Sequence, residues 1–366
     1  MEQIRARAIG RRELLMGSAA GGMTLALTAC SDGTEDTGSS GNKDLGEVTL
    51  VLDVPPYGKH SPFYVATKKD FWKKRGLKVS IQSAKGSSDA VTKIGAGAGE
   101  IGFADTSAVI QGRANNGIKA KLVCMFHYKN LMSVQALSSE GIRTPKDLVG
   151  KTIVTTAGDG GLVLLPALAE INGFDEKKVT ITYADHPSLP GAVAGKKADG
   201  DIDYLTGYPS LQHAAKETGE KTTYFLYSDY GLDVYNNGIF VTDKYLKSSP
   251  DQVRAFTAGF VDGIVYTVAH PDEAVRIFRD AVPGISADIA KEQQQIAIDH
   301  LHVPEVEKNG FGPMSRKKMD YTLELANKYF EIKKPFSDVN EVYTNAYVPR
   351  GKVPQFRSRA PSASPK

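Results

Sequence analysis

The chain has 366 residues, of which 41% are hydrophobic and 24% are charged, and its formal net charge is +3. This composition is typical of a globular protein, and the length is enough for two domains. The small net charge gives no electrostatic reason to expect nucleic-acid binding. With only Cys30 and Cys124, the chain has neither a disulfide framework nor a cysteine metal site, and Cys124 in the apolar run "AKLVCMF" is expected to be a buried, inert thiol.

The first 29 residues have the order of a bacterial export signal. Four arginines, at 5, 7, 11 and 12, precede a mildly apolar stretch that is shorter than the roughly 20 apolar residues of a membrane-spanning helix. "LTAC" at 27–30 resembles a lipoprotein box, which predicts a cleaved signal peptide, residues 1–29, and a lipidated Cys30. "GRRELLMG" resembles a twin-arginine signal, but a Sec signal that contains two arginines explains it equally well, so both export routes stay open.

Both ends of the expected mature chain are polar. Removal of residues 1–29 takes away four arginines and two glutamates, which lowers the formal net charge from +3 to +1. Residues 30–45 contain "SDGTEDTGSSGNKD", a Gly- and Ser-rich segment that predicts a flexible tether after the lipid anchor. Residues 346–366 are basic and rich in Pro and Ser, which predicts a disordered basic tail.

Between tether and tail, short apolar runs rich in Val, Ile and Thr alternate with longer amphipathic segments. This alternation predicts an α/β protein whose sheets carry helices on both faces. From Pro250 onward the pattern becomes helical and opens with a Ser-Pro start signal. The strands that we expect are 48–54, 78–84, 101–105, 121–126, 152–156, 179–184, 201–207 and 222–227.

The glycine-rich stretch "GAGEIG" at 97–102 satisfies the dinucleotide-binding pattern G-x-G-x-x-G. Its context differs from that of a phosphate site, because it closes an expected helix at 88–94 and precedes a strand, whereas a phosphate loop follows a strand and opens a helix. We therefore interpret it as a helix C-cap and a tight turn.

A second glycine-rich loop, in "IVTTAGDGGLVLL" at 153–165, has the order of strand, glycines and helix. It lacks the Gly-Lys-Ser/Thr of a nucleotide-binding loop. The backbone N–H groups of Gly160 and Gly161 lie at the positive end of the helix, where they can receive a carboxylate, a sulfonate or a ring oxygen. The carboxylate of Asp159 competes for these donors as a helix cap. A capped turn and a ligand-binding loop are both compatible with this pattern.

No catalytic motif stands out in the sequence. It has no G-x-S-x-G elbow, no H-E-x-x-H and no cysteine in the setting of a nucleophile. The seven histidines are scattered, and "DHLH" at 299–302 is typical of a surface segment. We predict no catalytic residue, no bound metal and no cofactor.

Aromatic and small polar residues collect after the expected strands. Loops at the carboxyl ends of parallel strands are where α/β proteins bind ligands. These positions are Tyr57 and His60 after the first strand, Thr106 and Ser107 after the third, Tyr208 after 201–207, and Tyr230 and Tyr235 in "DYGLDVYNNG". Their shared position predicts one ligand-binding site.

Four long stretches of the chain resemble solute-binding proteins of bacterial ABC importers. The superfamily includes binding proteins for thiamine pyrimidine precursors, riboflavin, nitrate, sulfonates and taurine. The stretches are "LDVPPYGKHSPFYVATKKDFWKKRGLKVSI" (52–81), "AGAGEIGFADTSAV" (96–109), "IRTPKDLVGKTIVT" (142–155) and "GIFVTDKYLKSSPDQVRAFTAGFVDGIVYTVAHPDEAV" (238–275).

The resemblance implies a type II periplasmic-binding-protein fold with two lobes, two hinge strands and a ligand in the cleft between the lobes. Lobe one is expected at 46–132 and 240–345, and lobe two at 133–239. The loop of Gly158, Asp159, Gly160 and Gly161 then meets the ligand from lobe two, together with Tyr208 and Tyr235, while Tyr57, His60, Thr106 and Ser107 meet it from lobe one. A receptor of this kind is extracytoplasmic, anchored to the membrane through Cys30, monomeric and without catalysis, and it delivers its solute to an ABC permease and its ATPase.

The ligand class stays open at this stage. Pyrimidine-binding members commonly have a Trp after "LD" in the first motif, where this chain has Val54, and Tyr57 can substitute for that flat surface. The tyrosines favour a heteroaromatic solute such as a thiamine pyrimidine precursor or a riboflavin-like vitamin. Lys59, His60 and the glycine loop would suit an aromatic carboxylate, a sulfonate or nitrate. A pyrimidine-synthase-like enzyme is a third interpretation, and the cysteine cluster of that enzyme type is missing here.

Overall fold

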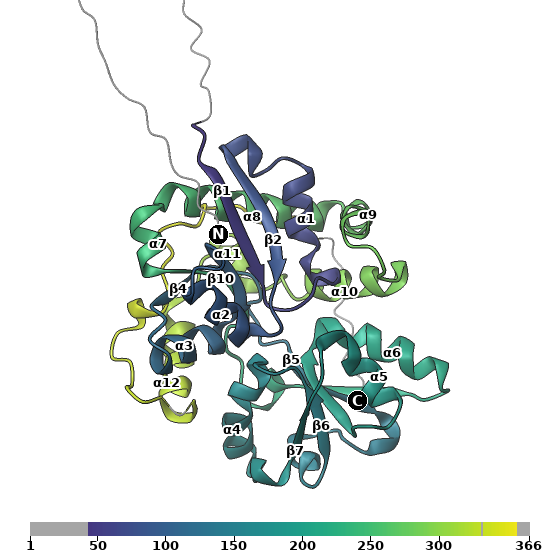
Figure 1. The fold of residues 1–366 in the computed structure, drawn as a ribbon. Coiled ribbons are helices and arrows are strands. Elements are labelled where there is room, and N and C mark those ends of the chain that lie inside the picture. The colour runs from purple at the N-terminus through teal and green to yellow at the C-terminus, as the bar shows by residue number, and fades with distance from the viewer. Residues whose placement is uncertain (1–42, 331, 357–366) are drawn as a thin grey trace, which may run out of the picture. The chain divides into compact units, whose positions relative to one another are not determined.

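The computed structural model describes residues 43–330 and 332–356 (Figure 1). The expected signal peptide, Cys30 and most of the expected tether lie outside these residues. Among the helices of the described part, none is both long and apolar enough to cross a membrane.

The first of two sheets has the strand order β2-β1-β3-β10-β4. Strand β1 pairs in parallel with β2 and β3, and β10 runs antiparallel between β3 and β4. Strands β1 to β4 come from the N-terminal part of the described chain, and β10 comes from much later in the sequence. Because β10 lies between β3 and β4, it brings the two parts of the sequence into one sheet. Its strands are β1 (Gly46–Leu52), β2 (Leu77–Ser83), β3 (Ile101–Asp105), β4 (Ala120–Met125) and β10 (Asn237–Thr242).

The second sheet has the order β7-β6-β8-β5-β9. Strand β6 is parallel to β7 and β8, and β5 runs antiparallel to β8 and β9. Its strands are β5 (Met132–Leu137), β6 (Thr152–Thr155), β7 (Thr180–Tyr183), β8 (Gly200–Tyr204) and β9 (Thr222–Leu226). We call residues 43–125 with 237–356 the first half and residues 132–226 the second half, after the sheets that they contain. The segments 126–131 and 227–236 connect the two sheets.

Helices surround both sheets. In the first half, Phe63 of α1 stacks on Phe260 of α8 with ring centroids 4.6 Å apart, and Trp72 donates from its indole N–H to the carbonyl of Phe256 at 2.8 Å. The helices of this half are α1 (Ser61–Lys68), α2 (Ser87–Gly95), α3 (Thr106–Asn115), α7 (Asp243–Ser248), α8 (Pro250–Ala269), α9 (Pro271–Ala281), α10 (Ala287–Asp299), α11 (Pro304–Asn309) and α12 (Arg316–Tyr329). Those of the second half are α4 (Gly160–Asn172), α5 (Leu189–Ala194) and α6 (Tyr208–Glu217).

The predicted α/β class is confirmed, and all eight expected strands exist with ends shifted by a few residues. Strands β5 and β10 were not among them. In β5 the polar Ser133 and Gln135 alternate with apolar residues, yet all six residues are buried, so the pattern does not mark a central strand. Strand β8 ends at Tyr204, because 205–207 form a 3-10 turn. The interpretation of "GAGEIG" as a turn is confirmed, since α2 ends at Gly95 and Gly97 has a φ of 79°.

Helix α8 and the expected tail differ in part from the sequence-based predictions. Helix α8 begins at Pro250 as predicted, but the side chain of Ser249 makes no capping hydrogen bond. The first part of the expected tail is packed: Val348 is buried, Lys352 pairs with Asp262, and the Phe356 ring stacks on that of His302 with centroids 4.6 Å apart. The ordered chain therefore extends beyond residue 345, to at least Phe356. Cys124 is a buried free thiol, as expected.

Candidate ligand-binding site

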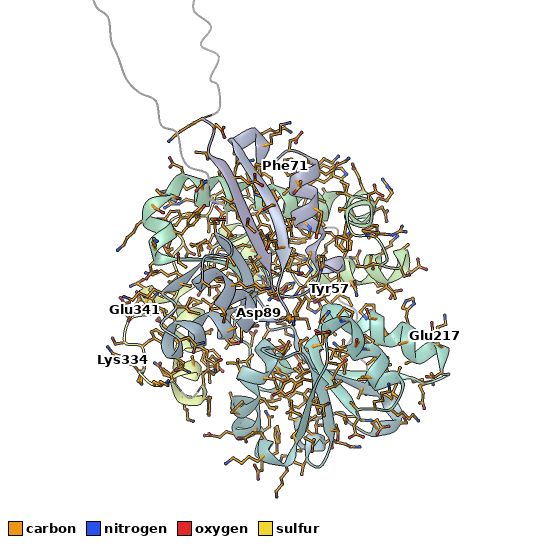
Figure 2. The ribbon with its side chains drawn as sticks, in the orientation of Figure 1. Tyr57, Phe71, Asp89, Glu217, Lys334 and Glu341 are labelled. Carbon is orange, nitrogen blue, oxygen red and sulfur yellow. The ribbon has the colours of Figure 1, made fainter. Side chains whose placement is uncertain are left out.

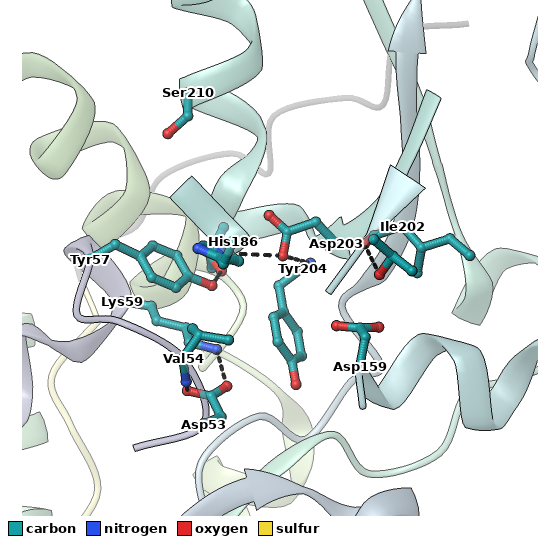
Figure 3. Close-up of polar contacts among 12 residues, drawn as sticks. Asp53, Val54, Tyr57, Lys59, Asp159, His186, Ile202, Asp203, Tyr204 and Ser210 are labelled. Atoms are coloured by element: carbon teal, nitrogen blue, oxygen red, sulfur yellow. Dashed lines mark hydrogen bonds and ion pairs between the residues drawn. The ribbon is translucent and has the colours of Figure 1, made fainter. Parts of the chain in front are cut away.

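A buried ion pair lies directly after the first strand of the first half. Asp53 follows β1 and lies beside Lys59 (Figure 3). Lys59 and a second partner, His60, belong to the short 3-10 turn Gly58–His60. The ammonium of Lys59 donates to Asp53 Oδ2 at 2.7 Å, and His60 Nε2 lies 2.9 Å from Asp53 Oδ1. The side chains of all three are fully buried. A carboxylate, an ammonium and an imidazole therefore share one buried site.

Burial and pairing act in opposite directions on these groups. Burial alone would raise the pKa of Asp53, but the ammonium of Lys59 and the ring of His60 outweigh it and hold this pKa well below its usual value. Burial lowers the pKa of His60 to about 4, so the imidazole is neutral at pH 7. Its Nδ1 accepts from the backbone N–H of Tyr57 at 3.1 Å, which assigns the proton to Nε2 and makes this atom the donor to Asp53.

The second half meets this cluster through the last residue of β8. The hydroxyl of Tyr204 lies 3.1 Å from the Ser87 hydroxyl and accepts from Asn237 Nδ2 at 3.1 Å, and both partners belong to the first half. The ammonium of Lys59 lies 3.7 Å from the centroid of the Tyr204 ring, a cation–π distance. Tyr204 of the second half thus contacts the first half through both its hydroxyl and its ring.

Three more carboxylates surround the same region, and two of them have raised pKa values. Burial raises the pKa of Asp105 to about 6, although hydrogen bonds from Ser107 oppose the rise. Burial, followed by the charges of Asp203 and Asp105, raises the pKa of Asp159 well above its ordinary value. With Asp53 and Asp203, this region therefore contains four buried carboxyl groups, of which Asp53 binds the ammonium of Lys59.

Tyr57 also spans the two halves, as its position where they meet in Figure 2 shows. Its hydroxyl lies 2.9 Å from the Thr206 hydroxyl, and its side chain is buried. The edge of the His60 ring meets the Tyr57 ring with centroids 5.0 Å apart, while the His186 ring lies at 5.1 Å and is tilted by only 31°. His186 in turn places Nε2 3.2 Å from Asp203 Oδ1. The position where we expect a flat ligand to stack thus carries an aromatic ring.

The loop of Gly158 to Gly161 packs against the first half. The backbone N–H of Ser88 donates to the Gly158 carbonyl at 3.0 Å, and the Ser107 hydroxyl donates to the Gly160 carbonyl at 3.3 Å. Asp159 Oδ1 accepts from the Gly161 N–H at 2.6 Å, so the interpretation of this turn as a capped helix start is confirmed. One of the two N–H donors proposed for a ligand therefore already has an acidic partner.

Of the other residues that the sequence predicts for the site, Thr106 and Ser107 lie in this buried cluster, and the remaining tyrosines make contacts elsewhere. Thr106 donates from its hydroxyl to the Asn236 carbonyl at 2.7 Å, and Ser107 bonds the carboxylate of Asp105. Tyr208 contacts its own half, with its hydroxyl 2.7 Å from that of Thr222 and its ring on Tyr224. Tyr235 donates to Glu305, and Tyr230 to the Arg143 carbonyl. The structure therefore does not bring Tyr208, Tyr230 and Tyr235 to the contacts that join Tyr57 to the second half.

Sequence reasoning did not select several residues of this cluster. Four of them, Asp53, Asp105, Asp203 and Tyr204, share one signal: each lies at or just after the end of a buried strand, where burial of a polar group is costly unless it has a partner or a ligand. The expected strand 201–207 hid this signal, because Asp203 and Tyr204 were placed inside it. The residues are Asp53, Ser87, Asp105, His186, Asp203, Tyr204 and Asn237.

The arrangement of the two sheets and their helices is the fold of periplasmic solute-binding proteins. The structure is similar to the alkanesulfonate-binding protein SsuA from Xanthomonas axonopodis pv. citri, with a TM-score of 0.65 and 14% identity over 81% of this chain and 98% of that chain. At this identity the likeness shows the fold. Residues 58–274 match the family model described as NMT1/THI5 like, and the chain belongs to this family.

Relatives of known function include both binding proteins and enzymes. A formylaminopyrimidine-binding protein from Halalkalibacterium halodurans is 24% identical over 76% of this chain and 84% of its own length. A riboflavin-binding protein from Chloroflexus aurantiacus is 25% identical over 89% of this chain and 95% of its own length. A 4-amino-5-hydroxymethyl-2-methylpyrimidine phosphate synthase from Saccharomyces cerevisiae is 22% identical over 79% of this chain and 89% of its own length.

Proposed function

We propose that the chain is an extracytoplasmic receptor of an ABC importer that binds a small heteroaromatic solute, such as a thiamine pyrimidine precursor or a riboflavin-like vitamin. The observation that carries the proposal is the buried cluster of Tyr57, Lys59, Asp159, Asp203 and Tyr204, which takes its members from both halves (Figure 3). A receptor that closes on its solute needs such a set, because the ligand then stabilises the closed arrangement.

The chemistry of the cluster favours a ring with N–H donors over an anion. The groups that would attract an anion already have acidic partners: Lys59 and His60 bind Asp53, and the N–H of Gly161 binds Asp159. An additional anion would therefore find these donors already paired, with further buried carboxyl groups close by, which is unfavourable. An aminopyrimidine or a flavin ring instead offers N–H groups to these acceptors and a flat face to tyrosine.

The cellular setting follows from the chain start and the relatives. We propose that residues 1–29 are a signal peptide, that Cys30 is lipidated, and that the two-lobed receptor acts as a monomer outside the membrane. Closure about the two connecting segments would then present the solute to a permease. The proposed ligand contacts are Tyr57, His60, Thr106, Ser107 and the loop Gly158–Gly161, joined by Lys59, Asp203 and Tyr204 from the geometry.

The competing function is that of an enzyme like the yeast synthase. Two observations favour a receptor. The ammonium of Lys59 is held by Asp53 in a fully buried pair and is not a free amine. Burial also raises the pKa of Cys124, so this thiol is not an activated nucleophile. We therefore propose that the bound solute leaves unchanged.

A thermal-shift panel tests the proposed function. The protein is refolded to strip carried-over ligand, and its melting temperature is measured with aminopyrimidines, riboflavin, aromatic carboxylates, sulfonates and nitrate. A ligand at a hundred times its Kd adds about 2.7 kcal/mol, which moves the midpoint by several degrees. We expect a shift with one ring class and the same compound in the supernatant after denaturation. A shift only with the anions, or a new product by mass spectrometry, would overturn the proposal.

A further inference from the structure

His186 stands out because its ring makes the contacts that a flat ligand would make. It lies 5.1 Å from the Tyr57 ring at an interplanar angle of 31°, and its Nε2 lies 3.2 Å from Asp203 Oδ1. A planar nitrogen heterocycle is thus placed over a buried tyrosine with one ring nitrogen at a buried carboxylate. These are the stacking and N–H donor contacts that define recognition of a heteroaromatic ring.

The residues next to His186 in the sequence lie at the surface. His186 belongs to the three-residue 3-10 turn His186–Ser188 between β7 and α5, and its neighbours Asp185, Pro187 and Ser188 are exposed. The side chain of His186 is 11% exposed. Its ring contacts the ring of Tyr57, and its Nε2 contacts the carboxylate of Asp203. Tyr57 and Asp203, by contrast, are held in buried positions by Thr206 and by the backbone N–H of Tyr204.

We propose that the imidazole of His186 holds the place of the ligand ring in the unliganded protein, and that a flat nitrogen heterocycle with an N–H donor displaces it. The incoming ring then stacks on Tyr57 and donates to Asp203. The inference rests on the proposed function, because it places the ring of the same solute between Tyr57 and Asp203.

The test uses the full chain, the variant His186→Gly and imidazole as the probe. Removal of the side chain leaves a ring-sized gap between Tyr57 and Asp203, so free imidazole should bind this variant with one-to-one stoichiometry and raise its melting temperature. The wild-type protein should show no such shift. The same variant should bind 4-aminopyrimidine at least tenfold more tightly than wild type, because no side chain has to be displaced. His186→Ala provides a second variant if His186→Gly folds poorly.

His302 provides the matched control. Its ring likewise packs on an aromatic ring, that of Phe356 with centroids 4.6 Å apart, and its Nε2 likewise lies near a carboxylate, that of Glu307, at 2.6 Å. The side chain is 44% exposed, so His302→Gly opens to solvent and should not bind imidazole. Imidazole binding to both glycine variants or to neither would overturn the inference, as would weaker binding of 4-aminopyrimidine by His186→Gly. Failure of the proposed function would give a different result. In that case the wild-type protein would bind none of the ring compounds, whether or not His186→Gly binds imidazole.

Discussion

Replacement of Tyr204 by Phe removes a hydroxyl that joins the two halves and leaves the ring beneath Lys59. The hydroxyl makes two hydrogen bonds, with Ser87 and Asn237, each 3.1 Å long. Neither partner is orphaned by the change, because Ser87 Oγ still accepts from the Asp105 N–H at 3.0 Å and Asn237 Nδ2 still donates to Asp53 at 3.2 Å. At about 1 kcal/mol for each net hydrogen bond, we expect the free energy of unfolding to fall by about 1–2 kcal/mol.

Tyr227→Phe is the matched control. The hydroxyl of Tyr227 is fully buried and has no hydrogen-bond partner in the described structure. Its removal should leave stability within about 0.5 kcal/mol of wild type or raise it, because an unsatisfied buried hydroxyl is lost. Urea denaturation of the ligand-free proteins, with the slope m checked for constancy, measures both changes. An unchanged stability of Tyr204→Phe, or an equal loss in the two variants, would refute the account of Tyr204 as a tie between the halves.

Three further perturbations test the cluster. Asp53→Asn leaves the ammonium of Lys59 buried beside a neutral amide, so we expect the free energy of unfolding, measured by urea denaturation, to fall by about 3–5 kcal/mol. The double variant Asp53→Asn with Lys59→Met should recover much of this loss, because it also removes the unpaired ammonium. A double variant as unstable as the single one would contradict this reasoning. Because the pKa of Asp105 is raised to about 6, its folded form binds more protons than the unfolded chain between pH 4 and 6, so its contribution to stability is present at low pH and is lost as the pH rises. Asp105→Asn should therefore gain on wild type by up to about 3 kcal/mol between pH 4 and pH 7, and parallel pH profiles would speak against the shift. A Cβ at Gly160 would lie 2.7 Å from the Cβ of Asp105 across the halves, whereas one at Gly191 meets nothing within 4 Å. Gly160→Ala should thus weaken ligand binding by tenfold or more in calorimetry while Gly191→Ala does not, and equal affinities would show that this approach is not needed for closure.

The strands and the fold class follow from apolar runs, but two central strands do not. Six buried residues of β5 include Ser133 and Gln135, whose side chains bond to the carbonyls of Asp203 and Tyr204 and to each other. Such partners come from the neighbouring strand β8, so local patterning carries no sign of them. The alternation of polar and apolar residues in β5 therefore predicts a half-exposed strand, although the strand is buried.

The candidate site shows the same division between local and non-local information. Tyr57 and the glycine loop were reached because they follow strands or open a helix, which are local features. His186 lies on a short turn with no strand signal, and its role depends on Tyr57 and Asp203, which are distant in sequence. The anion interpretation of Lys59 and His60 failed to anticipate Asp53, which binds both.

Isothermal titration of the refolded protein with 4-aminopyrimidine, and in parallel with methanesulfonate, decides whether this chain is a receptor for a ring compound. We expect one-to-one binding of the pyrimidine, recovery of the compound unchanged after denaturation, and no heat from the sulfonate. Binding of the sulfonate without the pyrimidine would contradict this proposal, because the ammonium of Lys59 is already bound by Asp53 and the same region holds three further buried carboxyl groups.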